Sequence, residues 1–132
     1  MRLLIIDGSV EIIRRLEELL SELTTISAIH TSASYEKGIK LFKENRPDIV
    51  LLDIFLPENK SLKLLGEMKA ARYKKSIIIL SNDSKDYQEL CHLLGVDYLL
   101  DKYHDFDKIP GVINGISFNN QVVKMLTNEK PA

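Results

Sequence analysis

Cysteine and tryptophan are scarce in this sequence of 132 residues: Cys91 is the only cysteine, and there is no tryptophan. A single cysteine excludes an internal disulfide. With three scattered histidines, it also makes a structural zinc site improbable. This composition is typical of a reducing compartment, so we expect a cytoplasmic protein.

The sequence also lacks an excess of charge of either sign. Eighteen lysine and arginine residues stand against nineteen aspartate and glutamate residues, which gives a formal net charge of −1. Overall charge therefore does not favour nucleic-acid binding. The longest apolar runs, such as 49–52 and 77–80, are far shorter than the about 20 residues of a membrane-spanning helix. Asp7 comes too early for a signal peptide. We expect neither nucleic acid nor a membrane as a partner.

What the sequence does contain is two alternating apolar patterns. Short unbroken runs predict strands that are buried on both faces at 3–6, 49–52, 77–80 and 98–100, and a weaker edge strand is expected at 25–31. Amphipathic stretches predict helices at 9–23, 34–44, 61–71 and 86–94. A last helix is expected from about 109 to 125, short or broken because Gly111, Gly115 and Asn119 interrupt it.

Five strands that alternate with five helices predict a parallel sheet with helices on both faces. Short connections and right-handed crossovers favour a flavodoxin-like, doubly wound α/β fold with the strand order 2-1-3-4-5. We expect one domain over residues 1–126, followed by a flexible tail at 127–132.

Polar residues follow four of the predicted strands, and in such folds the carboxyl ends of the strands form the ligand site. They are Asp7, Asp53, Ser81 and Lys102. Two neighbouring carboxylates favour a hard cation such as Mg²⁺. A metal, a lysine and a hydroxyl can then hold the oxygens of a phosphoryl group. The set predicts phosphoryl transfer onto an aspartate.

Each of these residues also has a purely structural interpretation. Asp53 and Asp7 could cap the end of a strand or the start of a helix, Ser81 could belong to a turn, and Lys102 could be solvated. Asp101 should face solvent, because strand alternation points it away from Lys102. Cys91 falls on the apolar stripe of its predicted helix and is expected in the core.

Four segments together resemble a response-regulator receiver domain, and the similarity extends over residues 1 to 126. They are Ile5–Asp7, Pro47–Pro57, Ile79–Asn82 and Gly95–Lys102. The resemblance implies that Asp53 accepts a phosphoryl group and that Asp7 belongs to a metal site. It also implies that Ser81 is the switch hydroxyl, that Lys102 contacts the phosphoryl group and that the backbone carbonyl of Phe55 binds the metal.

The sequence departs from the family pattern at several positions. Gly8 stands where the family has a second acid, so Mg²⁺ binding should be weak. Leu99 occupies the place of the switch aromatic, and the adjacent Tyr98 should face the other way. Tyr103 replaces the proline that usually follows the lysine, and Lys60–Ser61 replaces a glycine before the third helix. The phosphorylation switch is the property that these changes affect.

The interpretation that follows is a stand-alone receiver. A histidine kinase or a phosphotransfer protein would phosphorylate Asp53, and the protein would signal by binding a downstream protein that the sequence does not identify. It would be no enzyme beyond catalysing its own phosphorylation and dephosphorylation, and it would be a monomer or a weak homodimer. Two alternatives stay open: a degenerate receiver that binds its partner without phosphorylation, and a flavodoxin-like domain for a small molecule.

Overall fold

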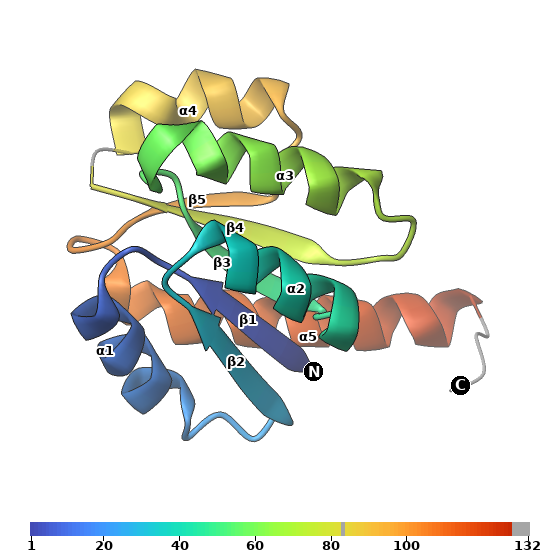
Figure 1. Cartoon of the computed structure of the whole chain (residues 1–132). Coiled ribbons are helices and arrows are strands. Elements are labelled where there is room, and N and C mark those ends of the chain that lie inside the picture. Colours follow the sequence, from blue (N-terminus) through green and yellow to red (C-terminus); the bar gives the residue numbers. More distant parts are fainter. Residues whose placement is uncertain (83, 128–132) are drawn as a thin grey trace.

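Five parallel strands form the central sheet of the computed structural model, which describes residues 1–82 and 84–127, with only the backbone of 84–86. The strands lie in the order β2-β1-β3-β4-β5 (Figure 1). Their bounds are β1 Arg2–Ile6, β2 Ala28–Ser32, β3 Ile49–Asp53, β4 Ser76–Ser81 and β5 Tyr98–Asp101. The predicted fold class and strand order are confirmed, although the edge strand begins later than expected.

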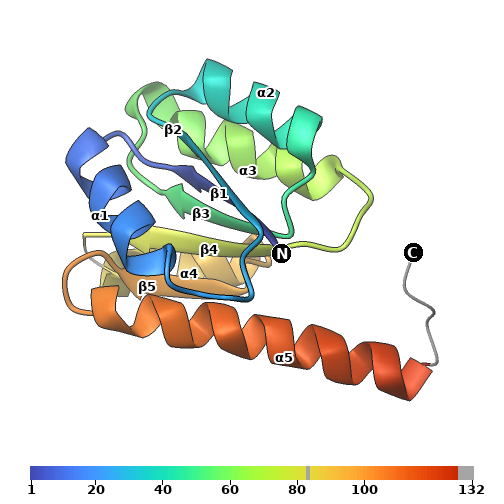
Figure 2. The same ribbon diagram turned by 90° about the horizontal axis from the view of Figure 1, so that it is seen from below.

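Helices cover both faces of the sheet, as predicted. Figures 1 and 2 show α1 and α5 on one face and α2, α3 and α4 on the other. The helices are α1 Val10–Leu20, α2 Tyr35–Asn45, α3 Lys60–Ala70, α4 Ser84–Leu93 and α5 Ile109–Thr127. Two short 3₁₀ turns, η1 Pro57–Asn59 and η2 Phe106–Lys108, lead into α3 and α5.

The unbroken apolar runs arise because each inner strand is buried on both sides. In β1, Leu3 and Ile5 pack toward α1 and α5, whereas Leu4 and Ile6 pack toward α2 and α3. Cys91 lies in the second of these clusters, as expected. The two cores fix the sheet between its helices, so the strand ends are held in a defined order.

The first helix begins as the sequence predicts but ends earlier. The Ser9 hydroxyl accepts a hydrogen bond from the N–H of Ile12 and caps α1. The helix ends at Leu20 and not at Leu23, where the backbone turns and the N–H of Leu23 donates to the Leu20 carbonyl. Leu23 still packs against the core, which explains why its apolar spacing resembled a continued helix.

The expectation of a short or broken last helix was wrong. α5 is continuous over 19 residues and extends beyond the sheet (Figure 2). Ile109, Ile113 and Ile116 bury one face of the helix and anchor it. Gly111 and Gly115 have open space where a side chain would be, so they lower helix propensity without breaking the packing. Of the predicted tail, 127 ends α5, and 128–132 lie outside the described residues.

Candidate functional site

The carboxyl ends of β1, β3 and β5 bring three of the predicted site residues into contact. Asp7 follows β1, Asp53 ends β3, and Lys102 follows β5. The Lys102 ammonium lies 2.7 Å from Oδ2 of Asp7 and 3.2 Å from Oδ2 of Asp53. All three side chains are buried. Two carboxylates thus share one ammonium ion, which leaves one negative charge uncompensated among these three side chains.

Ser81 ends β4 beside this group and is also buried. It pairs with Asp101 in the sheet, and its carbonyl accepts a hydrogen bond of 2.8 Å from the N–H of Lys102. The structure therefore places all four predicted residues at one edge of the sheet.

Backbone N–H groups hold the two carboxylates in place. Oδ1 of Asp53 accepts from the N–H of Phe55 at 2.9 Å, and its Oδ2 accepts from the N–H of Gly8 at 3.2 Å. Oδ1 of Asp7 accepts from the N–H of Ser9 at 2.8 Å, so Asp7 also braces the entry to α1. The structural and the functional interpretations of Asp7 are thus compatible.

Burial raises the pKa of Asp7 above its ordinary value. The hydrogen bonds from Lys102 and the N–H of Ser9 oppose this effect, and the negative charge of Asp53 adds to it. Burial wins because the Asp7 side chain has essentially no solvent exposure. The site therefore holds a carboxylate whose charge is energetically costly in the folded protein.

The donor set bears on whether the site can hold Mg²⁺. Among the side chains that the structure describes, those of residues 1–82 and 87–127, no group of three acidic, histidine or cysteine residues is suited to a metal. Asp7 and Asp53 nevertheless direct two carboxylate oxygens at one point, where the ammonium of Lys102 now lies. Mg²⁺ commonly takes one or two protein carboxylates and keeps several waters. The pair fits such an ion, with Lys102 as a competing cation.

Gly8 has no conformational reason to be glycine. Its φ lies outside the left-handed region, so the backbone at this position does not require a glycine. A Cβ added there would lie 3.7 Å from Oδ2 of Asp53, an ordinary contact. A side chain at position 8 would therefore reach the pocket without strain.

Phe55 lies in the loop after β3, Tyr98 and Leu99 lie in β5, and none of these three is a buried aromatic side chain that could act as a switch. Phe55 is 45% exposed, and its ring meets that of Tyr87 edge-on at 5.1 Å between centroids. Leu99 packs into the core on the side of α2, α3 and α4, whereas Tyr98 packs into the core on the side of α1 and α5. The predicted opposite orientations of the two side chains are confirmed. Phe55 thereby joins the loop after Asp53 to α4.

Ser61 contributes to the site, and sequence reasoning missed it. Its buried hydroxyl donates to the backbone carbonyl of Asp53 and accepts from the N–H of Leu56 at 3.0 Å. It therefore ties the loop after β3 to the first turn of α3. In the sequence it looked like an ordinary serine at a helix start, because nothing local reveals a partner eight residues earlier.

Asp101 corrects another expectation, since it is buried and does not face solvent. Its Oδ1 accepts from the N–H groups of Tyr103 and His104 at 2.8 and 2.9 Å. These two hydrogen bonds, with that of His104 contributing more, lower the pKa of Asp101. The carboxylate caps the turn that follows β5, and this turn holds the backbone of Lys102.

Comparison with known proteins identifies the class to which this fold and site belong. Residues 3–114 match the sequence profile of the response regulator receiver domain. This match covers most of the chain, which therefore belongs to the receiver-domain family of two-component signalling proteins. Receiver domains are signalling proteins that interact with histidine kinases or phosphotransfer proteins.

Individual relatives agree with this family. The chain is 29% identical over 87 residues to a probable C4-dicarboxylate response regulator, DctR, of Bacillus subtilis; the match covers 64% of this chain and 38% of that protein. The signal receiver domain of a putative LuxO repressor protein from Vibrio parahaemolyticus superposes with a TM-score of 0.83 at 16% identity, covering 98% of both chains. A CheY-like receiver domain from Methylobacillus flagellatus gives 0.74 at 21% identity, covering 88% of this chain and 98% of that one.

The curated relatives are longer than this chain. The chain spans less than half the length of the curated relatives it matches, with 38%, 41% and 39% of three DctR proteins covered. Within the described part of the chain, no helix combines the length and apolarity needed to cross a bilayer.

Proposed function

We propose that this protein receives a phosphoryl group on Asp53 from a histidine kinase or a phosphotransfer protein and signals by binding another protein. The observation that carries this proposal is the contact of one buried ammonium, that of Lys102, with the carboxylates of both Asp53 and Asp7. A cation within reach of Asp53 favours negative charge there, which is what an incoming phosphoryl group adds.

The proposed transfer moves a phosphoryl group from a histidine nitrogen to a carboxylate oxygen of Asp53. The N–P bond breaks, an O–P bond forms, and the nitrogen keeps the electron pair of the broken bond. Lys102 would stabilise the charge on the phosphoryl oxygens, and the Ser81 hydroxyl would hold another of them. The N–H groups of Phe55 and Gly8 orient the carboxylate before the reaction.

Mg²⁺ belongs to this proposal as a weakly held ion. Asp7, Asp53 and the backbone carbonyl of Phe55 would hold it, and it would neutralise charge on the phosphoryl group. Because Gly8 supplies no carboxylate, we expect weak binding in which the cation competes with Lys102 for the two acids.

A degenerate receiver, which binds its partner without phosphorylation, is the second candidate. The ammonium of Lys102 already occupies the point at which both acids converge. In addition, Leu99 stands where the family has its switch aromatic. It has no ring or hydroxyl that could change position when the Ser81 hydroxyl binds a phosphoryl group. Under this proposal the protein would act as a constant interaction module with the same fold.

One titration separates the two candidates. Amide signals of the protein are followed by NMR while Mg²⁺ and beryllium fluoride, an acyl-phosphate mimic, are added. Phosphorylation predicts shifts around Asp53, Ser81 and Lys102, and labelling by acetyl phosphate that mass spectrometry locates on Asp53. The Asp53→Asn variant should lose both responses and keep its fold. The Asp107→Asn variant, changed at an exposed acid, should keep both.

The outcomes are distinct. Absence of shifts and of labelling at millimolar mimic would support the degenerate receiver. Labelling that persists in Asp53→Asn would overturn Asp53 as the acceptor. The extent of the receiver, residues 1–126, and a cytoplasmic location remain parts of the proposal. The same is true of a monomeric or weakly dimeric state.

A further inference from the structure

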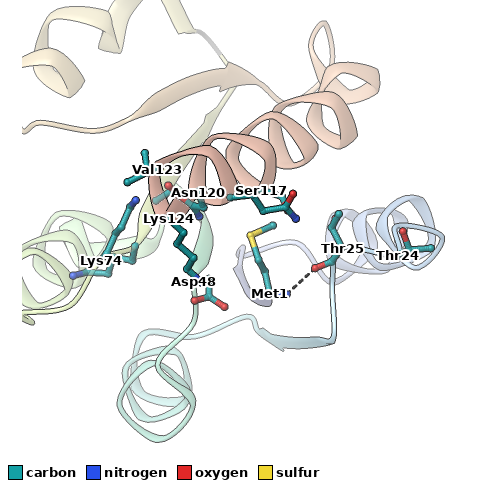
Figure 3. A pocket seen from close by; sticks show the side chains of 12 residues that line it. Met1, Thr24, Thr25, Asp48, Lys74, Ser117, Asn120, Val123 and Lys124 are labelled. Carbon is teal, nitrogen blue, oxygen red and sulfur yellow. Dashed lines mark hydrogen bonds between the residues drawn. The ribbon is translucent and has the colours of Figure 1, made fainter. Parts of the chain in front are cut away.

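A cavity of about 680 Å³ lies at the edge of the sheet opposite Asp53. It is lined by residues at the amino ends of strands, Asp48 before β3 and Ser76 at the start of β4, and by Thr24 and Thr25 between α1 and β2. Figure 3 shows Ser117, Asn120, Val123 and Lys124 of α5 along one side. The part of α5 beyond Ile116 thus forms a wall that a shorter helix would not supply.

The charges of this cavity are predominantly positive. Lys74, Lys75 and Lys124 line it, against Asp48 as the acid among its described lining residues. Oδ2 of Asp48 already accepts from the backbone N–H of Arg2 at 2.8 Å. In a protein with a formal net charge of −1, such a local excess of ammonium groups concentrates anions.

The three lysines differ in whether their ammonium groups form hydrogen bonds within the protein. The Lys75 ammonium donates to the carbonyls of Ala71 and Tyr73 at 2.8 and 3.1 Å, which fixes its position without neutralising its charge. Lys74 and Lys124 form no ion pair or side-chain hydrogen bond with any described residue. Two ammonium groups, one from the segment before β4 and one from α5, are therefore available to a ligand.

The remaining lining suits an uncharged, partly polar group. Ser117 is mostly buried, yet borders the cavity, and the amides of Asn120 and Gln121 can each donate and accept hydrogen bonds. Val123 and the side chain of Met1 supply apolar surface. The Met1 nitrogen donates a hydrogen bond of 2.7 Å to the Thr25 carbonyl, drawn as a dashed line in Figure 3, and this bond joins the start of the chain to the segment between α1 and β2.

We propose that this cavity binds a phosphorylated small molecule of nucleotide size, with its phosphates between Lys74 and Lys124 and with Lys75 adding to the positive potential. Ammonium groups bind phosphate as point charges, and several on one cavity favour a ligand with more than one negative charge. The volume lies within the about 300–1,000 Å³ of small-molecule sites. The neutral part of the ligand would lie along Asn120, Gln121 and Val123. This site is independent of the function proposed for Asp53.

The test is an NMR titration of the full chain with ATP in metal-free buffer. We expect saturable amide shifts at Thr24, Thr25, Ser76 and residues 117–124, with little change around Asp53. Pyrophosphate should bind at the same residues more weakly, and adenosine should not bind measurably. Lys74→Glu and Lys124→Glu should each weaken ATP binding about tenfold or more, since each reverses one charge.

Lys37→Glu is the matched control, because it makes the same charge change at an exposed residue in the first turn of α2, outside the cavity. It should leave ATP binding unchanged. Absence of saturable shifts up to millimolar ATP would overturn the proposal. Equal weakening by all three variants would also overturn it, since it would indicate non-specific attraction. If pyrophosphate bound as tightly as ATP, the proposal that the ligand is of nucleotide size would be wrong.

Discussion

At the scale of single residues, Lys102 sets the electrostatics of the site. Its ammonium contacts Asp7 at 2.7 Å and Asp53 at 3.2 Å in a buried setting. Removing the lysine would leave two buried carboxylates without a counter-charge, and leaving a buried charge unpaired typically costs about 3–5 kcal/mol. The same lysine therefore stabilises the unphosphorylated pocket and is available to a phosphoryl group.

Gly8→Asp should increase Mg²⁺ affinity. A carboxylate at position 8 would begin from a Cβ about 3.7 Å from Oδ2 of Asp53, and the backbone there needs no glycine. If the added charge is worth about 1–3 kcal/mol, binding should tighten roughly ten- to a hundredfold. Calorimetric titration of both proteins measures this. Gly8→Asn, without the charge, is the control, and equal Mg²⁺ affinity in all three proteins would contradict the prediction.

Asp7→Asn should stabilise the protein at neutral pH. Because burial raises the pKa of Asp7, its stability contribution is present below the unfolded-state value of 3.8 and is lost as pH rises through the folded-state pKa. The asparagine oxygen can still accept from Ser9, and the free energy of unfolding should rise by roughly 1 kcal/mol at pH 7. Chemical denaturation in metal-free buffer, from pH 7 down to pH 4, measures the difference.

The gain in Asp7→Asn should shrink as the pH falls, because protonated Asp7 resembles asparagine. Asp107→Asn, at an exposed acid, should show no comparable gain. A variant that is less stable than the natural protein at pH 7 would mean that the Lys102 contact outweighs the cost of burying Asp7.

At the scale of elements, the loop from β3 to α3 shows backbone strain and its compensation. Glu58 and Asn59 lie in succession in the left-handed region, with φ of 59° and 58°, and no side chain caps α3. The Ser61 hydroxyl compensates by joining the carbonyl of Asp53 to the N–H of Leu56. The left-handed residues precede Lys60–Ser61, where the family has a glycine, and Lys60 itself has a right-handed helical φ of −64°.

Glu58→Gly should raise the free energy of unfolding by about 1 kcal/mol, because glycine has no Cβ to disfavour the left-handed conformation. Thermal or chemical denaturation measures the change in the free energy of unfolding. The substitution leaves the proposed phosphoryl acceptor, Asp53, in place. Glu58→Ala removes the same carboxylate and keeps the Cβ, so it should not stabilise. Equal effects of the two substitutions would assign the change to the lost charge and not to backbone strain.

At the scale of the whole molecule, α5 presents two different surfaces. Its inner face packs on the sheet, whereas Phe118, Met125 and Leu126 are 65%, 78% and 80% exposed. Lys124 is the charged residue of this helix. Figure 2 shows the end of α5 projecting past the sheet. Exposed apolar side chains on a helix with a single charged residue favour association.

We therefore expect weak self-association that increases with protein concentration. Sedimentation equilibrium should give a dissociation constant in the range of about 0.1–1 mM, and Met125→Glu should abolish association by placing a charge on the apolar surface. Ala33→Glu, at an exposed residue in the loop between β2 and α2, should have no effect. A strictly monomeric protein at millimolar concentration would contradict this prediction.

The sequence by itself determined the fold class and the edge at which the site lies. Strands buried on both faces must be apolar throughout, so runs such as 49–52 can be recognised from a few consecutive residues. Asp7, Asp53 and Lys102 follow such runs, and parallel strands present their carboxyl ends at one edge. These inferences need only local periodicity and the handedness of the connections.

Only the tertiary structure decided the contacts that give the site its chemistry. The position of Lys102 between Asp7 and Asp53, the burial of Asp101 and the bridge made by Ser61 all depend on side-chain and loop conformations. The same holds for α5, whose glycines predict a broken helix although burial of its isoleucines keeps it whole. Local preferences of about 1 kcal/mol per glycine are outweighed by packing against residues distant in the sequence.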